Sequence, residues 1–110
     1  MAKRNGFDHV GWAEIKRGIM VDVCFAKFSQ NRPLRLALLS TVGSTLVEAS
    51  QYDRFWGIGL HINDPNVVNP NNWRGANTLG QVLGEVREML VRGFPVDAAN
   101  ANKHVNIVEK

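Results

Sequence analysis

The clearest periodic pattern of apolar positions lies towards the C-terminal end of the chain. Between residues 77 and 93 apolar side chains recur every three or four residues, which is the spacing of one helix face. Asn77 and Thr78 are residue types that cap helix N-termini, and Gly93 followed by Pro95 is a typical stop. The pattern predicts a helix from Asn77 or Thr78 to about Gly93. Its apolar positions are Leu79, Val82, Leu83, Val86 and Leu90.

A second helical pattern covers residues 12–28, where charged residues lie largely off an apolar stripe. The stripe consists of Trp12, Ile15, Ile19, Val23 and Phe28. A break follows at residues 30–33, because Pro33 is a first-turn residue with Asn31 or Arg32 at the cap position. We expect a short helix over 33–40 with Leu34, Leu38 and Leu39 facing inward, and Gly43 after it.

Between these helices the sequence reads as loop. Residues 45–48 form a brief apolar piece, extended or strand, and residues 51–73 are rich in Asn, Asp and Pro, which are turn residues. A loop of this length in a small domain is usually functional or disordered. The predicted fold class is mainly α: one small helical domain over residues 1–110, with a long site-forming loop between the second and third main helices. A flexible tail is expected over 97–110.

Composition narrows the class of protein without choosing a function. The 110 residues carry a net charge of +3 that is dispersed along the chain, which permits an anionic ligand but does not demand nucleic acid. The single cysteine, Cys24, has apolar neighbours and is expected to be a buried thiol. Neither a leader peptide nor a membrane-spanning run is recognisable. We therefore expect a cytoplasmic protein with no membrane partner.

The stretch from Glu48 to Gly80 has the composition of a ligand site. Trp56 stands beside Gly57 and Gly59, so its ring could stack on a heterocycle while bare backbone approaches the ligand. The alternatives are a core tryptophan and a tight turn. Gly75 and Asn77 precede the last helix, whose N-terminus could seat a phosphate, or could simply be capped.

Two carboxylates and one histidine are the candidates for chemistry. Glu48 and Asp53 could hold a ribose hydroxyl or transfer a proton, and the alternative is that both are surface carboxylates. His61 could contact a phosphate or face solvent. Arg87 on the last helix is either salt-bridged or turned towards a ligand. No metal-ligand spacing and no phosphate-binding loop motif is found, so we expect neither a metal nor a cofactor.

Taken together, several motifs resemble the NADAR family, whose best-known bacterial members are the YbiA-type N-glycosidases. The similarity extends from about Trp12 to Leu90. The matching segments are Trp12-x-x-x-Lys16-x-x-x-Met20, Ala26-Lys27-Phe28, Leu38-Leu39-x-Thr41, Leu46-Val47-Glu48-Ala49-Ser50, Asp53-x-x-Trp56-Gly57-x-Gly59, Trp73-x-Gly75-x-Asn77-x-Leu79-Gly80 and Val86-Arg87-x-x-Leu90.

The resemblance implies a mainly helical enzyme that hydrolyses the N-glycosidic bond of a nucleotide-like substrate. Its substrates would be phosphorylated ribosylamino-pyrimidines of riboflavin synthesis, or ADP-ribose attached to guanine, including ADP-ribosylated nucleic acid. Trp12 and Trp56 would be pocket aromatics, and Glu48, Asp53, Gly57 and Gly59 would surround the sugar. Gly75 and Asn77 would close the pocket. The resemblance implies no cofactor.

The resemblance also implies a segment before Trp12 with a Glu-His helix whose glutamate is catalytic, and Glu48 is a different position. The chain begins too close to Trp12 to include that segment, so a truncated domain is expected. Where this chain has Ile58, some bacterial members have Asp. The open alternatives are a non-catalytic module that binds ADP-ribose or a nucleotide, and a chain whose site a partner or a second copy completes.

Overall fold

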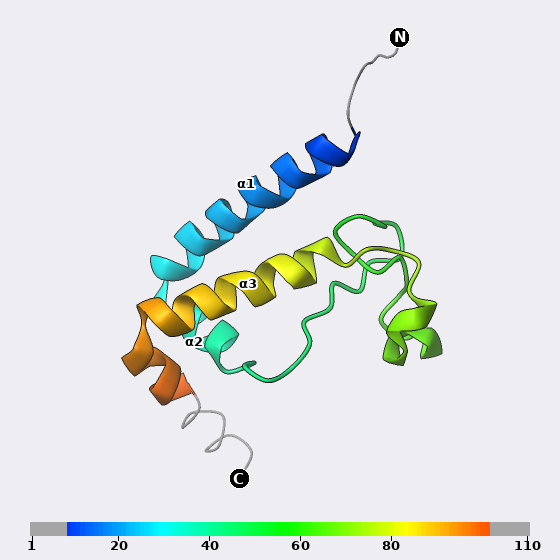
Figure 1. Cartoon of the computed structure of the whole chain (residues 1–110). Helices are drawn as coiled ribbons and strands as arrows, with labels where there is room; N and C mark the ends of the chain where they lie inside the picture. Colours follow the sequence, from blue (N-terminus) through cyan, green and yellow to red (C-terminus); the bar gives the residue numbers. More distant parts are fainter. Residues whose placement is uncertain (1–8, 102–110) are drawn as a thin grey trace.

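The computed structural model describes residues 9–101, and over this range the chain is helical with no strand. The main helices are α1 (His9–Ser29), α2 (Arg32–Leu39) and α3 (Thr78–Gly93). Residues 95–101 form a further helical segment after Phe94. Figure 1 shows α1 and α3 side by side, with α2 across one end and the connecting loop towards the other. The predicted fold class is confirmed.

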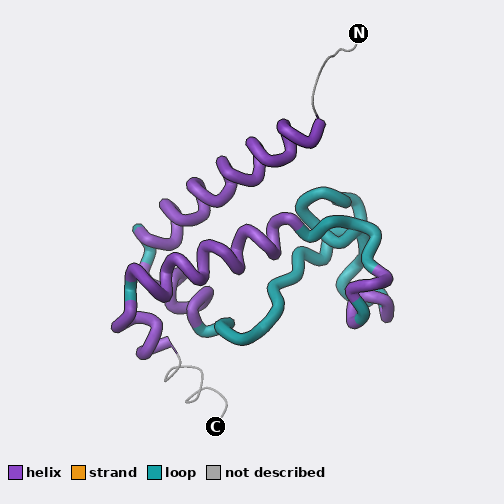
Figure 2. The backbone as a smooth tube through the Cα atoms, viewed as in Figure 1, coloured by secondary structure: helices purple, strands orange, loops and turns teal. Residues whose placement is uncertain are grey.

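The long connection between α2 and α3 contains only short helical turns. Two 3-10 turns, η1 (Pro65–Val68) and η2 (Pro70–Asn72), follow one another far from α2 (Figure 2). Each begins at a capping side chain: Asp64 accepts from the Asn66 N–H, and Asn69 accepts from the Asn71 N–H. The Asn- and Pro-rich sequence therefore folds as turns, as predicted.

The core is built between α1, α2 and α3. Val82, Val86 and Leu90 on α3 have no exposed surface, which confirms the stripe predicted for the last helix. Leu38 and Leu39 of α2 are buried as predicted, whereas Leu34 is 37% exposed. Asn31 caps α2 through a hydrogen bond from the Leu34 N–H, and Gly43 has a φ of 94° just beyond it.

The orientation of α1 contradicts four of the five positions of its predicted apolar stripe, whereas Phe28 packs against the core as predicted. Met20, Cys24 and Phe28 belong to the core or pack against it, while Ile15, Ile19 and Val23 are 55%, 55% and 57% exposed. Trp12, 44% exposed, lies at the start of the same outer face. The inward face of α1 was predicted wrongly because the helix is apolar on two faces, and the apolar row with the more regular spacing is the outer one.

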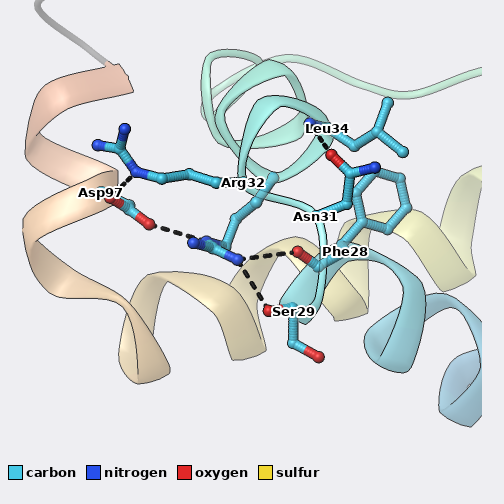
Figure 3. A network of polar contacts seen from close by, with 7 residues as sticks. Phe28, Ser29, Asn31, Arg32, Leu34 and Asp97 are labelled. Carbon is cyan, nitrogen blue, oxygen red and sulfur yellow. Dashed lines mark hydrogen bonds and ion pairs between the residues drawn. The ribbon is translucent and has the colours of Figure 1, made fainter.

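Three arginines hold the chain around the core. Arg35 is buried and donates to Asp97 (2.8 Å) and to the carbonyls of Phe28 and Ser29, so it links α1, α2 and residues 95–101 (Figure 3). Arg32 donates to the other oxygen of Asp97 at 3.1 Å. Arg87 donates to the carbonyls of Thr41 (2.7 Å) and Ser44 (2.9 Å), which fixes the turn after α2. Neither alternative considered for Arg87 is observed.

The predicted tail needs correcting where it is described. Residues 97–101 are helical, Asp97 pairs with the two arginines, and Ala101 has no exposed surface. Pro95 suits the first turn of a helix and the alanines that follow favour one, which is the signal that was missed. The rest of the predicted tail, 102–110, lies outside the described residues. Within the described part, no helix is both long and apolar enough to cross a membrane.

Candidate functional site

The loop from Leu46 to Leu60 and the chain entering α3 are joined by a dense set of hydrogen bonds, here called the backbone junction. Ile58 donates its N–H to the Glu48 carbonyl (3.0 Å), and Arg74 donates to the Ile58 carbonyl (2.8 Å). Four successive N–H groups, those of Ala76, Asn77, Thr78 and Leu79, then donate to the carbonyls of Arg54, Gly57, Phe55 and Trp56 respectively. The sequence analysis had placed these two segments in one site, and in the structure they are in contact.

These bonds change the prediction for the N-terminus of α3. A helix N-terminus attracts phosphate through N–H groups that have no partner within the helix. Here the N–H groups of Thr78 and Leu79 are already bonded to loop carbonyls at 3.0 Å. Backbone carbonyls of the loop therefore cap α3. The N–H groups of Thr78 and Leu79, which were predicted to be available to a phosphate, already have partners.

Asn77 fastens the junction from inside. It is buried and adopts a left-handed backbone with a φ of 55°. Its Oδ1 accepts from the Glu48 N–H (2.9 Å), and its Nδ2 donates to the Leu46 carbonyl (3.0 Å). Asn77 does stand at the N-cap of α3, but its side chain makes no capping bond. It holds the incoming loop instead.

Gly57 and Gly75 are needed where the two backbones meet. A Cβ at residue 75 would overlap the carbonyl oxygen of Gly57, and one at residue 57 would lie 2.9 Å from the carbonyl oxygens of both Glu48 and Asp53. Gly59 has a φ of 72°, which disfavours other residues. Backbone-to-backbone packing thus accounts for the glycines without a ligand.

Asp53 and Trp56 orient the middle of the loop. Asp53 Oδ1 accepts from the N–H groups of Phe55 (2.9 Å) and Trp56 (2.8 Å). The Trp56 ring is half-buried, packs against the core, and meets the Phe55 ring edge-on at 4.6 Å and 85°. The core reading of Trp56 is therefore observed, and Phe55 is the ring that it holds in place.

The remaining predicted site residues, Glu48, His61 and Trp12, are exposed. Glu48 is exposed and enters the junction through its backbone. His61 is exposed, and its Nδ1 accepts from the Asn63 N–H at 3.1 Å. Trp12 lies on the outer face of α1. None of the three lines the pocket described next.

An open pocket of about 420 Å³ lies where α1, the loop and the start of α3 meet. This volume is within the range of roughly 300–1,000 Å³ found for small-molecule sites. Its wall combines one aromatic ring, small residues and polar side chains. The lining residues are Ala13, Glu14, Arg17, Phe55, Ala76, Thr78 and Gln81.

Charged groups surround the Phe55 ring. The Lys16 ammonium lies 3.9 Å from the ring centroid, which is a cation–π contact. Arg17 is paired with Glu85 at 2.6 Å between Nη2 and Oε2. Glu14 is the one carboxylate among the seven lining residues. The pocket wall thus contains the Phe55 ring, the Glu14 carboxylate and the paired Arg17 guanidinium, and the Lys16 ammonium lies over the ring.

The described residues include no group of three or more His, Cys, Asp or Glu side chains that could hold a metal ion. Cys24 is buried in the core, as expected, and burial raises the pKa of its thiol above the usual value. The raised pKa disfavours the thiolate, so Cys24 is unsuited to act as a nucleophile at neutral pH.

None of the seven lining residues was among the predicted site residues, although Ala76 and Thr78 lie in the segment predicted to seat a phosphate. Glu14 and Gln81 look like ordinary helix-surface residues, and Ala13 has no distinguishing chemistry. Phe55 was the detectable one, because it adjoins Trp56 in a segment already singled out.

Comparisons with known proteins place the chain in a family. The model of the NADAR domain matches residues 1–91. The protein irg-1 of Caenorhabditis elegans is 47% identical over 79 residues, and N-glycosidase R617 of Acanthamoeba polyphaga mimivirus is 42% identical over 82. N-glycosidase YbiA of Escherichia coli is 37% identical over 79 residues.

These matches cover 72%, 74% and 72% of this chain but only 37%, 48% and 42% of the respective relatives. The chain therefore spans less than half the length of the curated relatives that it matches. No solved structure matches it. Because the domain model covers most of the chain, and the motifs around Asp53, Trp56 and Asn77 form the junction that shapes the pocket, the protein belongs to the NADAR family.

Proposed function

We propose that this protein contributes the base-binding wall of an N-glycosidase site, at which the bond between ribose and a base is hydrolysed. The observation that carries the proposal is the pocket beside Phe55, which lies between α1 and the start of α3 in a chain of the NADAR family. Relatives that are named N-glycosidases support the reaction class.

The pocket suits a nucleotide-like ligand. The Phe55 ring is large, flat and held by Trp56, so it can pack against a heterocycle with little loss of conformational entropy. Lys16 places positive charge beside the ring, which favours a phosphorylated ligand, while Arg17 is paired with Glu85. The substrate classes we propose are the ribosylamino-pyrimidine phosphates of riboflavin synthesis and ADP-ribosyl-guanine.

The reaction needs a negative charge near the sugar. When the bond between C1′ and the base nitrogen breaks, the bonding electrons leave with the base and the ribose becomes an oxocarbenium ion. The departing base nitrogen takes up a proton, and water adds to C1′ and releases one, which must be accepted. Glu14 is the lining residue that can stabilise the cation or accept this proton, so we assign it that role.

The motif residues have a positioning role in this proposal. Asp53 and Trp56 set the Phe55 ring, while Gly57, Gly75 and Asn77 hold the loop against α3. Glu48 and Asp53 were the sequence candidates for catalysis. Asp53 Oδ1 already accepts two backbone hydrogen bonds, which favours positioning over proton transfer.

A second candidate function is binding of ADP-ribose or a nucleotide without cleavage. It is favoured by the single lining carboxylate, since glycosidases commonly use a pair. In that case the pocket would bind ligand and release no base.

The test is an assay of the purified chain with both substrate classes, in which free base is measured by chromatography and ADP-ribose binding by calorimetry. We expect base release that falls about 100-fold in Glu14→Gln, the usual size of an acid–base contribution. Glu48→Gln is the matched control and should retain activity. Phe55→Ala should weaken binding, whereas Tyr52→Ala, at a ring that is 90% exposed, should not.

Saturable binding without base release would favour the binding module. Neither binding nor release would contradict both functions. Equal activity of Glu14→Gln and the unaltered chain would remove Glu14 from the reaction.

A further inference from the structure

The Thr78 hydroxyl is a polar group in the pocket wall that the protein itself does not pair. Thr78 lines the pocket and exposes only 6% of its surface. Its hydroxyl makes no hydrogen bond to another described residue. Among the described residues, Arg87 Nε is the one fully enclosed side-chain atom without a partner, so the Thr78 oxygen is not sealed off from the pocket. Because a buried polar group is costly to leave unpaired, this hydroxyl is suited to bond to a ligand.

Gln81 follows Thr78 on the same face of α3, and its amide has a defined orientation. Residues three apart on a helix are neighbours, and both side chains line the pocket. Gln81 Nε2 donates to the Ala76 carbonyl at 2.9 Å. Since a carbonyl only accepts, the nitrogen must be the atom that faces Ala76, and the amide oxygen Oε1 is left to accept from a ligand. The α3 side of the pocket therefore presents a hydroxyl and an oriented acceptor.

These two groups adjoin the ring against which a base would pack. The Thr78 N–H donates to the carbonyl of Phe55 itself at 3.0 Å, so Thr78 and Phe55 are adjacent in the wall. A heterocycle that lies flat on a ring carries its hydrogen-bonding atoms around its edge. One edge of such a base can therefore meet the start of α3, while Glu14 lines the pocket from α1.

Resting on the proposed function, we propose that Thr78 and Gln81 are the residues that select the base. Gln81 Oε1 accepts from an amino group on the base edge, and the Thr78 hydroxyl donates to the ring nitrogen or carbonyl next to it. The ligand class is an amino-substituted heterocycle on a ribose phosphate. The phosphate itself does not fit here, because phosphate oxygens and Oε1 are both acceptors.

The test measures by calorimetry how guanosine monophosphate and inosine monophosphate bind to the purified 110-residue chain. The two nucleotides differ only in the amino group on the base. We expect the guanine nucleotide to bind about fivefold more tightly, which is the effect of one hydrogen bond between uncharged groups. Gln81→Met removes the acceptor at similar side-chain length and should abolish this difference. Gln51→Met, at an exposed position, is the matched control and should retain it.

Thr78→Val removes the hydroxyl and keeps the branched shape of the side chain. It should weaken the binding of both nucleotides by about fivefold, and Thr78→Ser, which retains a hydroxyl, should restore most of the affinity. Thr45→Val, at an exposed position, is the matched control and should bind as the unaltered chain does. The unfolding midpoint of each variant establishes that it is folded.

Equal affinity of the unaltered chain for the two nucleotides, or no binding of either, would overturn the proposal. So would an unchanged preference in Gln81→Met or unchanged affinity in Thr78→Val. Base release is measured separately, so the two proposals can fail independently. A chain that releases base without distinguishing the nucleotides loses only the selection by Thr78 and Gln81. A chain that distinguishes them but releases no base contradicts only the hydrolysis.

Discussion

The backbone junction and the outer face of α1 differ in what they leave uncovered. At the junction, N–H and carbonyl groups from Leu46 to Leu79 satisfy one another, and two glycines admit the contact. On α1, a row of aliphatic side chains is left exposed. The junction residues predicted to bind a ligand thus bond to other parts of the protein. The α1 stripe predicted to face the core is instead mostly at the surface.

This difference shows that a motif predicts which segments of the chain meet more reliably than it predicts whether its residues contact a ligand or other parts of the protein. Glycine and asparagine permit close approach, whether the approaching group is a ligand or another stretch of backbone. Apolar spacing identifies helix faces that can be buried, but it does not show which of two such faces packs against the rest of the chain.

The largest expected effect at the junction is that of Asn77→Ala. It leaves the Glu48 N–H and the Leu46 carbonyl without their partner and puts alanine at a φ of 55°. We expect a loss of about 3 kcal/mol in the free energy of unfolding, measured by urea denaturation. Asn72→Ala, at an exposed position, is the control and should change little. A loss similar to that of the control would mean that the junction does not hold the loop.

Gly75→Ala should have the next largest effect. Its Cβ would overlap the Gly57 carbonyl oxygen, and backbone on both sides leaves little room to relax. We expect about 2 kcal/mol of destabilisation. The matched control is Gly84→Ala in α3, where nothing lies within 4 Å of the added Cβ, and a gain of up to about 1 kcal/mol is expected. The comparison fails if both substitutions shift the unfolding midpoint in the same direction.

A smaller effect on stability is expected when acid protonates Asp97, which pairs with Arg32 and Arg35. Hydrogen bonding from Arg35, opposed by burial and aided by Arg32, lowers the pKa of Asp97 below its usual value. The unfolded carboxylate, with a pKa of about 3.9, therefore takes up a proton before the folded one does. The stabilisation is present above this value and is lost as pH falls through the unfolded and then the folded pKa.

Asp97→Asn removes this titration. Thermal unfolding between pH 6 and pH 3 should show a shallower decline for the variant than for the unaltered chain. Parallel curves would mean that Asp97 does not contribute to the acid sensitivity.

The smallest effect is expected on the outer face of α1. Ile19→Ala in the chain alone should cost no more than about 0.5 kcal/mol, because the side chain is mostly in water already. Val86→Ala, at a buried position of α3, provides the contrast, and denaturation of both variants measures it. Equal losses would show that Ile19 is covered within this chain.

Much of the fold was predictable because local signals agreed with tertiary packing. The α3 stripe and the turns around Pro65 and Pro70 were predicted correctly from residue types, and Asn31 was one of the two cap positions considered for α2. The facing of α1 was not predictable, because two apolar rows compete and only contact with α3 selects one. The helix after Pro95 was missed because its few apolar residues show no clear period.

The candidate site was predictable in place and less so in detail. The sequence located the meeting of the Trp56 segment with the start of α3, and the pocket lies beside that meeting. The direct roles assigned to Asp53, Trp56, Gly57 and Asn77 stay predictions, alongside the internal contacts that the structure shows for them. Glu14 and Gln81 carry no motif, and only the packing of α1 beside α3 brings them to one pocket.

The central claim is that ligand binds beside Phe55 while the motif residues hold the loop. The most direct measurement is a nuclear magnetic resonance titration of the ¹⁵N-labelled chain with ADP-ribose. The account predicts the largest amide shifts at Ala13, Glu14, Arg17 and Gln81. Shifts confined to Gly57, Gly59 and His61, with α1 unaffected, would contradict it.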